Sequence, residues 1–436
     1  MTYEAHSDDS LAFDTLQLHA GYDPAGHNGS KAVPLYQTAA FELGDFERCT
    51  RLFDYEEEGH SYVRFSNPTS EVLEKRIAAL EGGAAAVCMS SGMSAISNTL
   101  LNLAQAGDEI AAVKTLYGGT TTLLADVLPD YGITTTWVED ADDLDAYAAA
   151  ITEKTKALHI ESLGNPSVNV IDIEAVAAVA HERGVPLVVD NTFATPYLLR
   201  PFDFGADIVC HSTTKYLSGH GTTIGGIAVE KGGFDWLNGR FPQIERFLAE
   251  NAPHIEASEL QRTAFTRRLR MRYLTELGGH MSPMNAFLTL QGVETLSLRM
   301  QRHAENALKV AEFLEGHPEV LEVSYPSLPS SPYHALAAKY FPRGSGAILS
   351  VRVRGGLAGA KRVLARVRIF DYMVNVGDTK SLIVHPATSI RHGLAPDVQR
   401  RAGVFEDTLR LSVGTEDAGD LLRDLDQALA VVLARA

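Results

Sequence analysis

The chain has few cysteines and no long apolar run. Its 436 residues include three cysteines, Cys49, Cys88 and Cys210, which are too few and too scattered for a disulfide framework or a CxxC metal site. No apolar run is long enough to span a membrane. The first residues, MTYEAHSDDS, lack the basic stretch and following apolar stretch of a secretion signal. We therefore expect a cytoplasmic protein whose thiols are reduced and buried.

Basic residues are also scarce relative to acidic ones. There are 38 lysines and arginines against 55 aspartates and glutamates, a formal net charge of -17. Such a surface repels nucleic acid and anionic membranes, so we expect neither as a partner. The one dense basic run, RTAFTRRLRMR at residues 262–272, is interpreted as the solvated face of a helix.

Short apolar runs alternate with helical or loop segments between residues 84 and 230. This rhythm predicts an α/β fold with a mostly parallel seven-stranded sheet and helices on both faces. A helix should begin at Pro68, after the capping residue Asn67, and stop at Gly82 and Gly83. The predicted strands are residues 84–89, 109–113, 133–138, 157–161, 185–190, 207–211 and 224–229.

The rest of the chain divides around this alternating region. Residues 1–67 lack sustained periodicity and are predicted to form an arm that contacts a neighbouring subunit. Residues 68–275 would form the large domain. Residues 276–436 would form a smaller C-terminal α/β domain that contains a long helix over about 295–315.

The segment HSTTKYLSGHG places Lys215 directly after a predicted buried strand. Burial there would desolvate the ammonium and lower its pKa, which a lysine that forms a Schiff base requires. The neighbouring hydroxyls of Ser212 and Thr214 could hold the phosphate of a carbonyl cofactor. The alternative is a snorkelling lysine beside a loop.

Asp190 ends another predicted buried strand, 25 residues before Lys215. An acid followed by a strand-borne lysine is the arrangement that binds pyridoxal 5'-phosphate (PLP). The lysine takes the aldehyde and the acid pairs with the protonated ring nitrogen. The alternative role for Asp190 is to cap the next segment, although an acid that closes a valine-rich strand is costly unless it is paired.

Other polar residues follow predicted strands and could complete a cofactor site. Gly92 and Met93 open a helix whose amides could hold a phosphate, or they simply form a capped turn. Tyr117 could stack on the cofactor ring or belong to the core. Asn165 could bind the phenolic oxygen of the cofactor or form a turn. Arg410 could bind a substrate carboxylate or make a structural ion pair.

Two further patterns surround Lys215. His211 and His220 flank the lysine without companion ligands at metal spacing, so they are interpreted as structural and no metal is expected. Residues 212–215 also match the SxxK pattern of serine acyl hydrolases, but the accompanying SDN and KTG elements are absent.

In this order, the motifs resemble those of the Cys/Met-metabolism family of PLP-dependent enzymes, over nearly the whole chain. The O-acetylhomoserine sulfhydrylase branch is the most similar. Motifs that carry the resemblance are FDTLQLHAGYDP, YVRFSNPT, SSGMSA, VVDNTFATPYLLRP, HSTTKYLSGHG, GGFDWLNGRFP and RLSVGTED.

The resemblance implies an aspartate-aminotransferase-like PLP-dependent transferase fold and a homotetramer built as a dimer of dimers. Each active site would borrow Tyr62 and Arg64 from a neighbouring subunit. Arg410 and Asn375 would orient the substrate carboxylate.

One departure lies after HPAT, where this chain has Ser389, Ile390 and Arg391 near the expected position of the substrate side chain. The family residues implied for catalysis and cofactor binding are Lys215, Tyr117, Asp190, Gly92, Met93, Asn165, Ser212, Thr214, Tyr62 and Arg64, and those implied for the substrate are Arg410, Asn375, Ser389 and Tyr62.

The expected reaction is γ-replacement on O-acetyl-L-homoserine by sulfide or a small thiol, which gives homocysteine or methionine plus acetate. The alternatives within the family are a cystathionine or methionine γ-lyase and a cystathionine γ-synthase. Outside it, a serine acyl hydrolase and a non-catalytic binding protein stay open. The sequence leaves the sulfur donor and the choice between acetyl and succinyl undecided.

Overall fold

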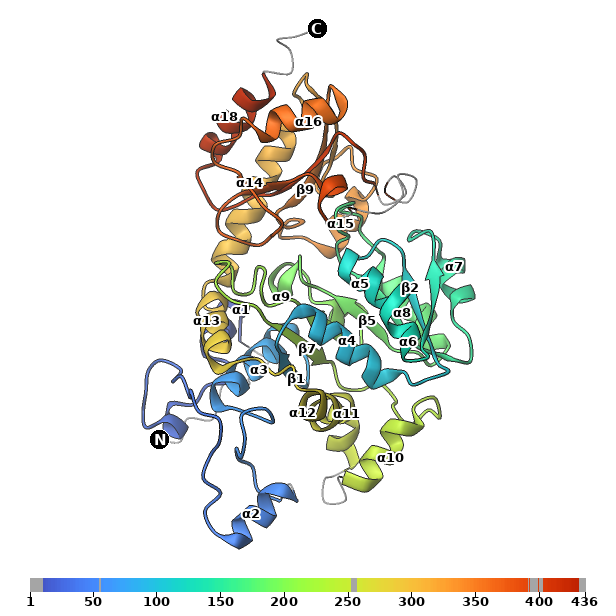
Figure 1. The fold of residues 1–436 in the computed structure, drawn as a ribbon, viewed down its shortest axis with the longest axis vertical. Coiled ribbons are helices and arrows are strands. Elements are labelled where there is room, and N and C mark those ends of the chain that lie inside the picture. Colours follow the sequence, from blue (N-terminus) through green and yellow to red (C-terminus); the bar gives the residue numbers. More distant parts are fainter. Residues whose placement is uncertain are drawn as a thin grey trace.

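The protein folds around two β-sheets, each with its own apolar core (Figure 1). A computed structural model describes residues 11–54, 56–251, 257–390, 392, 399 and 403–430. The long helix α14 (Leu296–Glu315) contacts α1 (Phe13–His19) and α9 (Thr195–Leu198) beside the first sheet. It also contacts β8 (Val320–Ser324) and β9 (Ile348–Val353) of the second. This confirms the predicted α/β fold class. The domain boundaries at residues 67 and 275 remain predictions.

The first sheet has seven strands in the order β1-β7-β6-β5-β4-β2-β3. β7 runs antiparallel to both of its neighbours, and the other pairs are parallel. All seven predicted strands are confirmed, with ends shifted by a residue or two. Their bounds are β1 (Ala85–Met89), β2 (Glu109–Val113), β3 (Thr134–Val138), β4 (Thr155–Glu161), β5 (Leu187–Asp190), β6 (Ile208–His211) and β7 (Gly226–Glu230).

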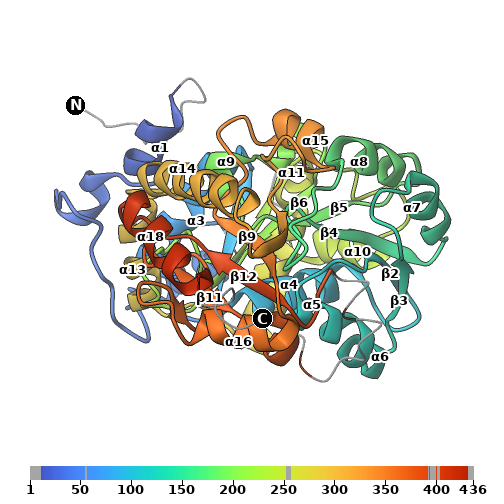
Figure 2. The same cartoon turned by 90° about the horizontal axis from the view of Figure 1, so that it is seen from above.

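Helices cover both faces of this sheet. Successive side chains of a strand point to opposite faces, and on β6 the Cys210 sulfur lies 3.5 Å from Thr99 of α4 while His211 lies 2.5 Å from Glu81 of α3. Thus α3 and α4 lie on opposite faces, and Figure 2 shows α7 and α8 across the strands from α5 and α6. The helices of this region are α3 (Pro68–Glu81), α4 (Gly92–Leu103), α5 (Gly118–Thr122), α6 (Leu128–Asp130), α7 (Leu144–Ala150) and α8 (Ile173–Glu182).

Helix α3 begins and ends where the sequence predicts. The Asn67 side chain accepts from the Thr69 amide at 2.9 Å, and Pro68 occupies the first turn, where its missing N–H costs no helical bond. Gly82 ends the helix at φ 76°, a left-handed conformation that favours glycine.

The parallel strands bring three chain segments to one edge of the sheet. In register, Glu161 of β4 lies beside Asp190 of β5, and Asp190 lies beside Cys210 of β6. The turn that follows β6 carries Lys215. Ligands of open parallel sheets bind beyond this carboxyl edge, so the topology itself gathers the polar residues predicted from sequence.

The second sheet has the strand order β10-β11-β12-β9-β8, and β10–β11 is its one parallel pair within the described residues. Helices α14, α16 (Gly356–Leu364) and α18 (Ala418–Leu429) pack on it or on one another. The strand bounds are β8 (Val320–Ser324), β9 (Ile348–Val353), β10 (Asp371–Tyr372), β11 (Leu382–Val384) and β12 (Thr408–Ser412).

The N-terminal segment is more structured than the expected arm. Helix α1 packs on α3 and α14, and Gln17 donates to the Ser297 hydroxyl at 2.9 Å. Residues 33–36 still pack beside the start of α3, where the Tyr36 amide donates to the Thr69 hydroxyl at 3.0 Å, and the chain then runs to α2 (Phe46–Phe53) at the lower end of Figure 1. The remaining helices are α10 (Pro242–Asn251), α11 (Ala257–Arg268), α12 (Thr275–Leu277), α13 (Pro283–Val293) and α15 (His334–Tyr340).

The basic run at residues 262–272 corrects one prediction. Arg268 is buried and donates to the backbone and side-chain oxygens of Asn102, each at 2.7 Å. Arg270 pairs with the nearly buried Glu74 at 2.6 Å. A solvated face was wrong for these two residues, because the helix packs against α3 and α4 and its inward arginines find buried acceptors.

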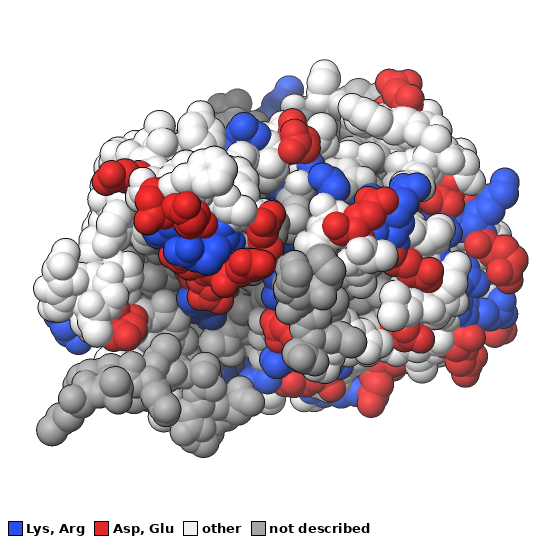
Figure 3. All heavy atoms as spheres, turned by 90° about the horizontal axis from the view of Figure 1, so that it is seen from below, with Lys and Arg blue, Asp and Glu red and all other residues white. Residues whose placement is uncertain are grey.

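Charges of both signs are interspersed on the face seen in Figure 3, which views the molecule of Figure 1 from below. Among the described residues, no helix is both long and apolar enough to cross a membrane.

Candidate active site

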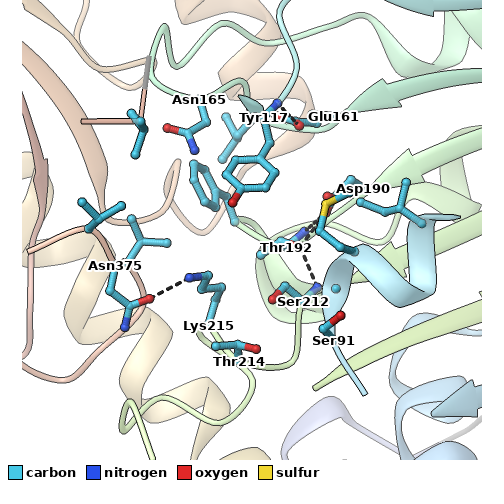
Figure 4. A pocket seen from close by; sticks show the side chains of 18 of the residues that line it. Ser91, Tyr117, Glu161, Asn165, Asp190, Thr192, Ser212, Thr214, Lys215 and Asn375 are labelled. Carbon is cyan, nitrogen blue, oxygen red and sulfur yellow. Dashed lines mark hydrogen bonds between the residues drawn. The ribbon is translucent and has the colours of Figure 1, made fainter. Parts of the chain in front are cut away.

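A cavity of about 220 Å³ lies at the carboxyl edge of the first sheet and is closed on one side by residues of the second (Figure 4). Strand ends, the first turn of α4 and the segment 374–376 contribute to its wall. Its lining residues are Ser91, Gly92, Met93, Ile96, Tyr117, Glu161, Leu163, Asn165, Asp190, Thr192, Phe193, Ser212, Thr214, Lys215, Ile224, Val374, Asn375, Val376, Ile390 and Arg410.

The amine of Lys215 points into this cavity. Its Nζ donates to Oδ1 of Asn375 at 2.7 Å. Burial, together with the positive charge of Arg410, lowers the pKa of Lys215 to about 8. An amine with that pKa is neutral in a substantial fraction of molecules near pH 7.5, so it can act as a nucleophile or a base.

Asp190 is held by the turn that follows it. The Thr192 amide and hydroxyl donate to Oδ1 of Asp190, at 3.0 and 2.5 Å, and the same hydroxyl accepts from the Ser212 amide at 2.8 Å. Burial raises the pKa of Asp190, while the Thr192 hydrogen bonds and nearby His211 lower it. Because both bonds use Oδ1, Oδ2 keeps its lone pairs for a cationic ligand.

The first turn of α4 forms a small anion cradle. Ser91 caps the helix by accepting from the Ser94 amide at 3.0 Å, and the amides of Gly92 and Met93 have no carbonyl one turn earlier. A Cβ on Gly92 would lie 2.6 Å from Cβ of Ser212, and one on Gly226 would lie 2.1 Å from the Ser91 carbonyl. Glycine is therefore required for the strands and this turn to approach so closely.

Tyr117 and Glu161 come together at the end of β4. The backbone N–H of Tyr117 donates to Oε1 of the buried Glu161. The Tyr117 side chain is 42% exposed, and its ring stands in the space between Asn165, Asp190 and Lys215 (Figure 4). A flat ligand could stack against this ring.

Arg410 reaches the cavity from β12 of the second sheet. It is 4% exposed, and its two terminal nitrogens donate to Oδ1 of Asn165 at 3.2 Å and to the Asn375 carbonyl at 3.0 Å. Its Nε is buried with no partner in the described part of the chain. Burial lowers the pKa of Arg410 to about 10, so the group stays cationic at neutral pH, and no acid among the described residues pairs with it. A bound carboxylate would supply one.

Comparisons with known proteins agree with this geometry. The family model described as Cys/Met metabolism PLP-dependent enzyme matches residues 14–430. This chain belongs to that family.

Members of the family with curated names are similar to it over nearly their whole lengths. A homocysteine synthase of Schizosaccharomyces pombe is 46% identical, over 97% of this chain and 99% of its own. An O-acetyl-L-homoserine sulfhydrylase of Leptospira meyeri is 45% identical, over 95% and 96%. The crystal structure of a putative O-acetylhomoserine (thiol)-lyase of Campylobacter jejuni, which contains a pyridoxyl-lysine monophosphate, superposes with a TM-score of 0.90 at 38% identity, over 96% and 100%.

The residues of the cavity fit the cofactor of a Cys/Met-metabolism enzyme. The α4 cradle offers amides to a phosphate, and Lys215 offers an amine of lowered pKa to an aldehyde. Asp190 retains a lone-pair-bearing oxygen for a ring nitrogen. The predicted PLP cofactor and the predicted fold are thus those of the family to which the chain belongs.

Most of the residues predicted for the site line the cavity, and three do not. Ser389 points away and donates to the His385 carbonyl at 2.7 Å, while its neighbour Ile390 lines the wall. Tyr62 and Arg64 lie outside this chain's cavity, and Arg64 donates to the Thr275 carbonyl. Arg391 lies outside the described residues. The predicted residues that do line it are Gly92, Met93, Tyr117, Asn165, Asp190, Ser212, Thr214, Lys215, Asn375 and Arg410.

Sequence reasoning missed Thr192 and Glu161. Thr192 follows Asp190 by two residues, the spacing at which a hydroxyl or amide folds back onto an aspartate. Glu161 ends a buried strand just as Asp190 does, so the same argument about a costly strand-end acid could have identified it. Thr214 lines the cavity, but its hydroxyl exchanges hydrogen bonds with the Gly225 backbone, at 3.0 and 3.2 Å.

Among the described residues, no cluster of three or more histidine, cysteine or acidic side chains is arranged to hold a metal. His211 pairs with Glu81, and His220 bonds to the Ser218 carbonyl at 2.6 Å. Both histidines therefore make hydrogen bonds to other residues of the protein.

Proposed function

We propose that the protein catalyses γ-replacement on O-acetyl-L-homoserine, in which sulfide or a small thiol displaces acetate to give homocysteine or methionine. The observation that carries this proposal is the near full-length similarity to a homocysteine synthase and an O-acetyl-L-homoserine sulfhydrylase, at 46% and 45% identity. The cavity supplies the groups that such a reaction needs.

Binding of the amino-acid substrate would rest on Arg410. Its guanidinium is fixed by Asn165 and Asn375, and its Nε has no partner among the residues that the structure describes, so it can take the substrate carboxylate without first being ordered. With the carboxylate at Arg410, the α-carbon of the substrate would lie toward the Lys215 amine, which faces the same cavity.

Proton movement would rest on Lys215. PLP, when bound, withdraws electrons from the substrate's α-carbon and so makes its proton acidic. The neutral Lys215 amine would take the proton from the α-carbon, and the same amine would serve the β-carbon before acetate leaves the γ-carbon. Asp190 would keep its negative charge beside the ring nitrogen, the Tyr117 ring would stack on the cofactor, and the Tyr117 hydroxyl would assist at the leaving oxygen.

Sulfide or thiol adds to the γ-carbon from which acetate departs, so the sum is substrate plus hydrogen sulfide giving homocysteine plus acetic acid. The test is to assay purified protein with O-acetyl- and O-succinylhomoserine, each with and without sulfide or methanethiol. Homocysteine or methionine formed only with added thiol supports the proposal. In a parallel assay with cystathionine or methionine and no thiol, release of ammonia and a keto acid would instead identify a γ-lyase.

We propose a homotetramer built from dimers in which Tyr62 and Arg64 of one subunit complete the site of the next, and we propose the cytoplasm as its compartment. Support comes from the segment that carries α2, which extends away from the sheets at the lower end of Figure 1. Mixing Lys215→Ala with Arg64→Ala protein tests the shared site. Hybrid dimers regain activity if one intact site forms from two chains, and stay inactive if each chain builds its own.

A further inference from the structure

A buried cation lies directly behind the lysine turn. Arg299 of α14 is 7% exposed and donates to the carbonyls of Tyr216 at 2.8 Å, Gly292 at 2.7 Å and Leu217 at 3.4 Å. Its Nε donates to the Thr295 hydroxyl at 3.2 Å. In the described part of the chain no acid pairs with it, so three backbone carbonyls and the Thr295 hydroxyl offset the cost of burying its charge.

Two of these carbonyls, those of Tyr216 and Leu217, belong to the turn that presents Lys215. The turn is closed by bonds from Lys215 to the Ser212 carbonyl at 3.2 Å, from Ser218 to Thr213 at 3.0 Å and from Gly219 to Lys215 at 2.8 Å. The carbonyls at the end of such a helical turn have no amide of the same turn to accept from. A guanidinium there satisfies two of them and complements their partial negative charge.

Three glycines hold the surrounding backbone against this turn. A Cβ on Gly292 would lie 2.2 Å from the Ser218 carbonyl, and one on Gly377 would lie 2.6 Å from the Tyr216 nitrogen. Gly219, at φ 72°, leaves room for Arg299, whose Nη1 would lie 2.1 Å from a Cβ there. The backbone of Lys215 is therefore enclosed on several sides. The Arg299 guanidinium packs against the end of the turn and holds its carbonyls in place.

We propose that Arg299 is a positioning residue for Lys215: it fixes the backbone of the lysine turn, so that the amine is held where it must move protons. The inference rests on the proposed function for what the amine does, and on geometry alone for where the amine is held. Helix α14, which contacts both sheets, would thus help to hold the active-site lysine in position.

The backbone part of the proposal is tested on the cofactor-free protein by hydrogen–deuterium exchange and mass spectrometry. Arg299→Lys and Arg299→Met are compared with Arg302→Met, a control on the same helix whose side chain is 56% exposed. We expect the peptide over 212–221 to exchange at least about tenfold faster in Arg299→Met, less so in Arg299→Lys, with peptides of β4 and β5 unchanged. Unchanged exchange over 212–221, or an equal rise in all peptides, would overturn the proposal.

The catalytic part is tested on the holoenzyme with O-acetylhomoserine deuterated at the α-carbon. Misplacing a reacting group by about 1 Å costs up to about 100-fold, so Arg299→Lys should lower kcat about 10- to 100-fold, change KM by less than about threefold and increase the primary isotope effect. If Arg299→Lys shows an unchanged isotope effect and a normal kcat, Arg299 does not position Lys215. This conclusion holds even if Arg299→Met fails to fold. If wild-type protein does not turn over this substrate, the proposed function fails, and the exchange experiment still decides the role of Arg299.

Discussion

Asn375 links the two cationic groups of the active site. Its side-chain oxygen accepts from the Lys215 amine at 2.7 Å, and its backbone carbonyl accepts from Arg410 at 3.0 Å. A single residue, Asn375, thus contacts both the amine proposed for proton transfer and the guanidinium proposed for carboxylate binding. A change at the Asn375 side chain should affect the amine and spare the guanidinium.

Replacing Asn375 by alanine tests this division of roles. The Lys215 amine loses a hydrogen bond worth about 1 kcal/mol, so we expect kcat to fall about five- to tenfold. KM for O-acetylhomoserine should stay within about threefold, because the backbone carbonyl still holds Arg410. Steady-state kinetics measure both. A large rise in KM with unchanged kcat would show that the side chain serves the substrate carboxylate instead.

The lowered pKa of Lys215 makes a prediction about stability. Burial disfavours the ammonium and lowers its pKa from 10.5 to about 8. Burying the charged amine therefore reduces the free energy of unfolding of the cofactor-free protein. This reduction is complete below pH 8 and disappears as the pH rises past 10.5. Lys215→Met should therefore raise the free energy of unfolding at pH 7 by about 2 kcal/mol, and by less at pH 9.5.

Urea denaturation of the cofactor-free protein at both pH values measures this difference. Lys309→Met, at an exposed position of α14, is the matched control and should change the unfolding free energy by less than about 0.5 kcal/mol. A Lys215→Met protein that is less stable than wild type at pH 7 would contradict the burial cost.

Thr192 should set the pH range in which Asp190 is ionised. Thr192→Val removes the hydroxyl that donates to Asp190, so the pKa of Asp190, already raised by burial, should rise further. The acidic limb of the kcat/KM profile then moves to higher pH, and cofactor affinity falls about tenfold. Thr192→Ser keeps the hydroxyl and should behave as wild type. An identical acidic limb in the valine and serine variants would refute the role.

Arg410 should be needed only for substrates that carry an α-carboxylate. Removing one partner of a buried charge pair costs about 2 kcal/mol or more, so Arg410→Gln should lower kcat/KM for O-acetylhomoserine at least about 30-fold. Wild type and variant should react equally with the analogue that lacks the carboxylate, O-acetyl-3-aminopropanol. A similar loss on both substrates would mean that Arg410 supports the structure of the site instead.

Local sequence signals predicted the elements that depend on local forces. The seven strands of the first sheet and the ends of α3 follow from apolar runs, an asparagine cap and glycine stops. Lys215, Asp190 and the α4 turn were found because strand-end polar residues must gather at one edge of a parallel sheet.

Contacts between distant segments were not predictable in this way. Nothing near Arg268 in the sequence shows that Asn102 would accept from it, and nothing near Ser389 shows that its hydroxyl turns toward His385 while Ile390 faces the cavity. No local pattern around Arg299 shows that it would meet the lysine turn, 82 and 83 residues away. Such pairings depend on how helices and strands pack, which the sequence pattern alone does not specify.

Reduction of the purified protein with borohydride, followed by peptide mass spectrometry, tests the central claim most directly. The account predicts a visible absorbance band that is bleached on reduction, and a phosphopyridoxyl group on Lys215 alone, absent from the Lys215→Ala protein. A colourless protein, or a label on another lysine with Lys215 unmodified, would contradict it.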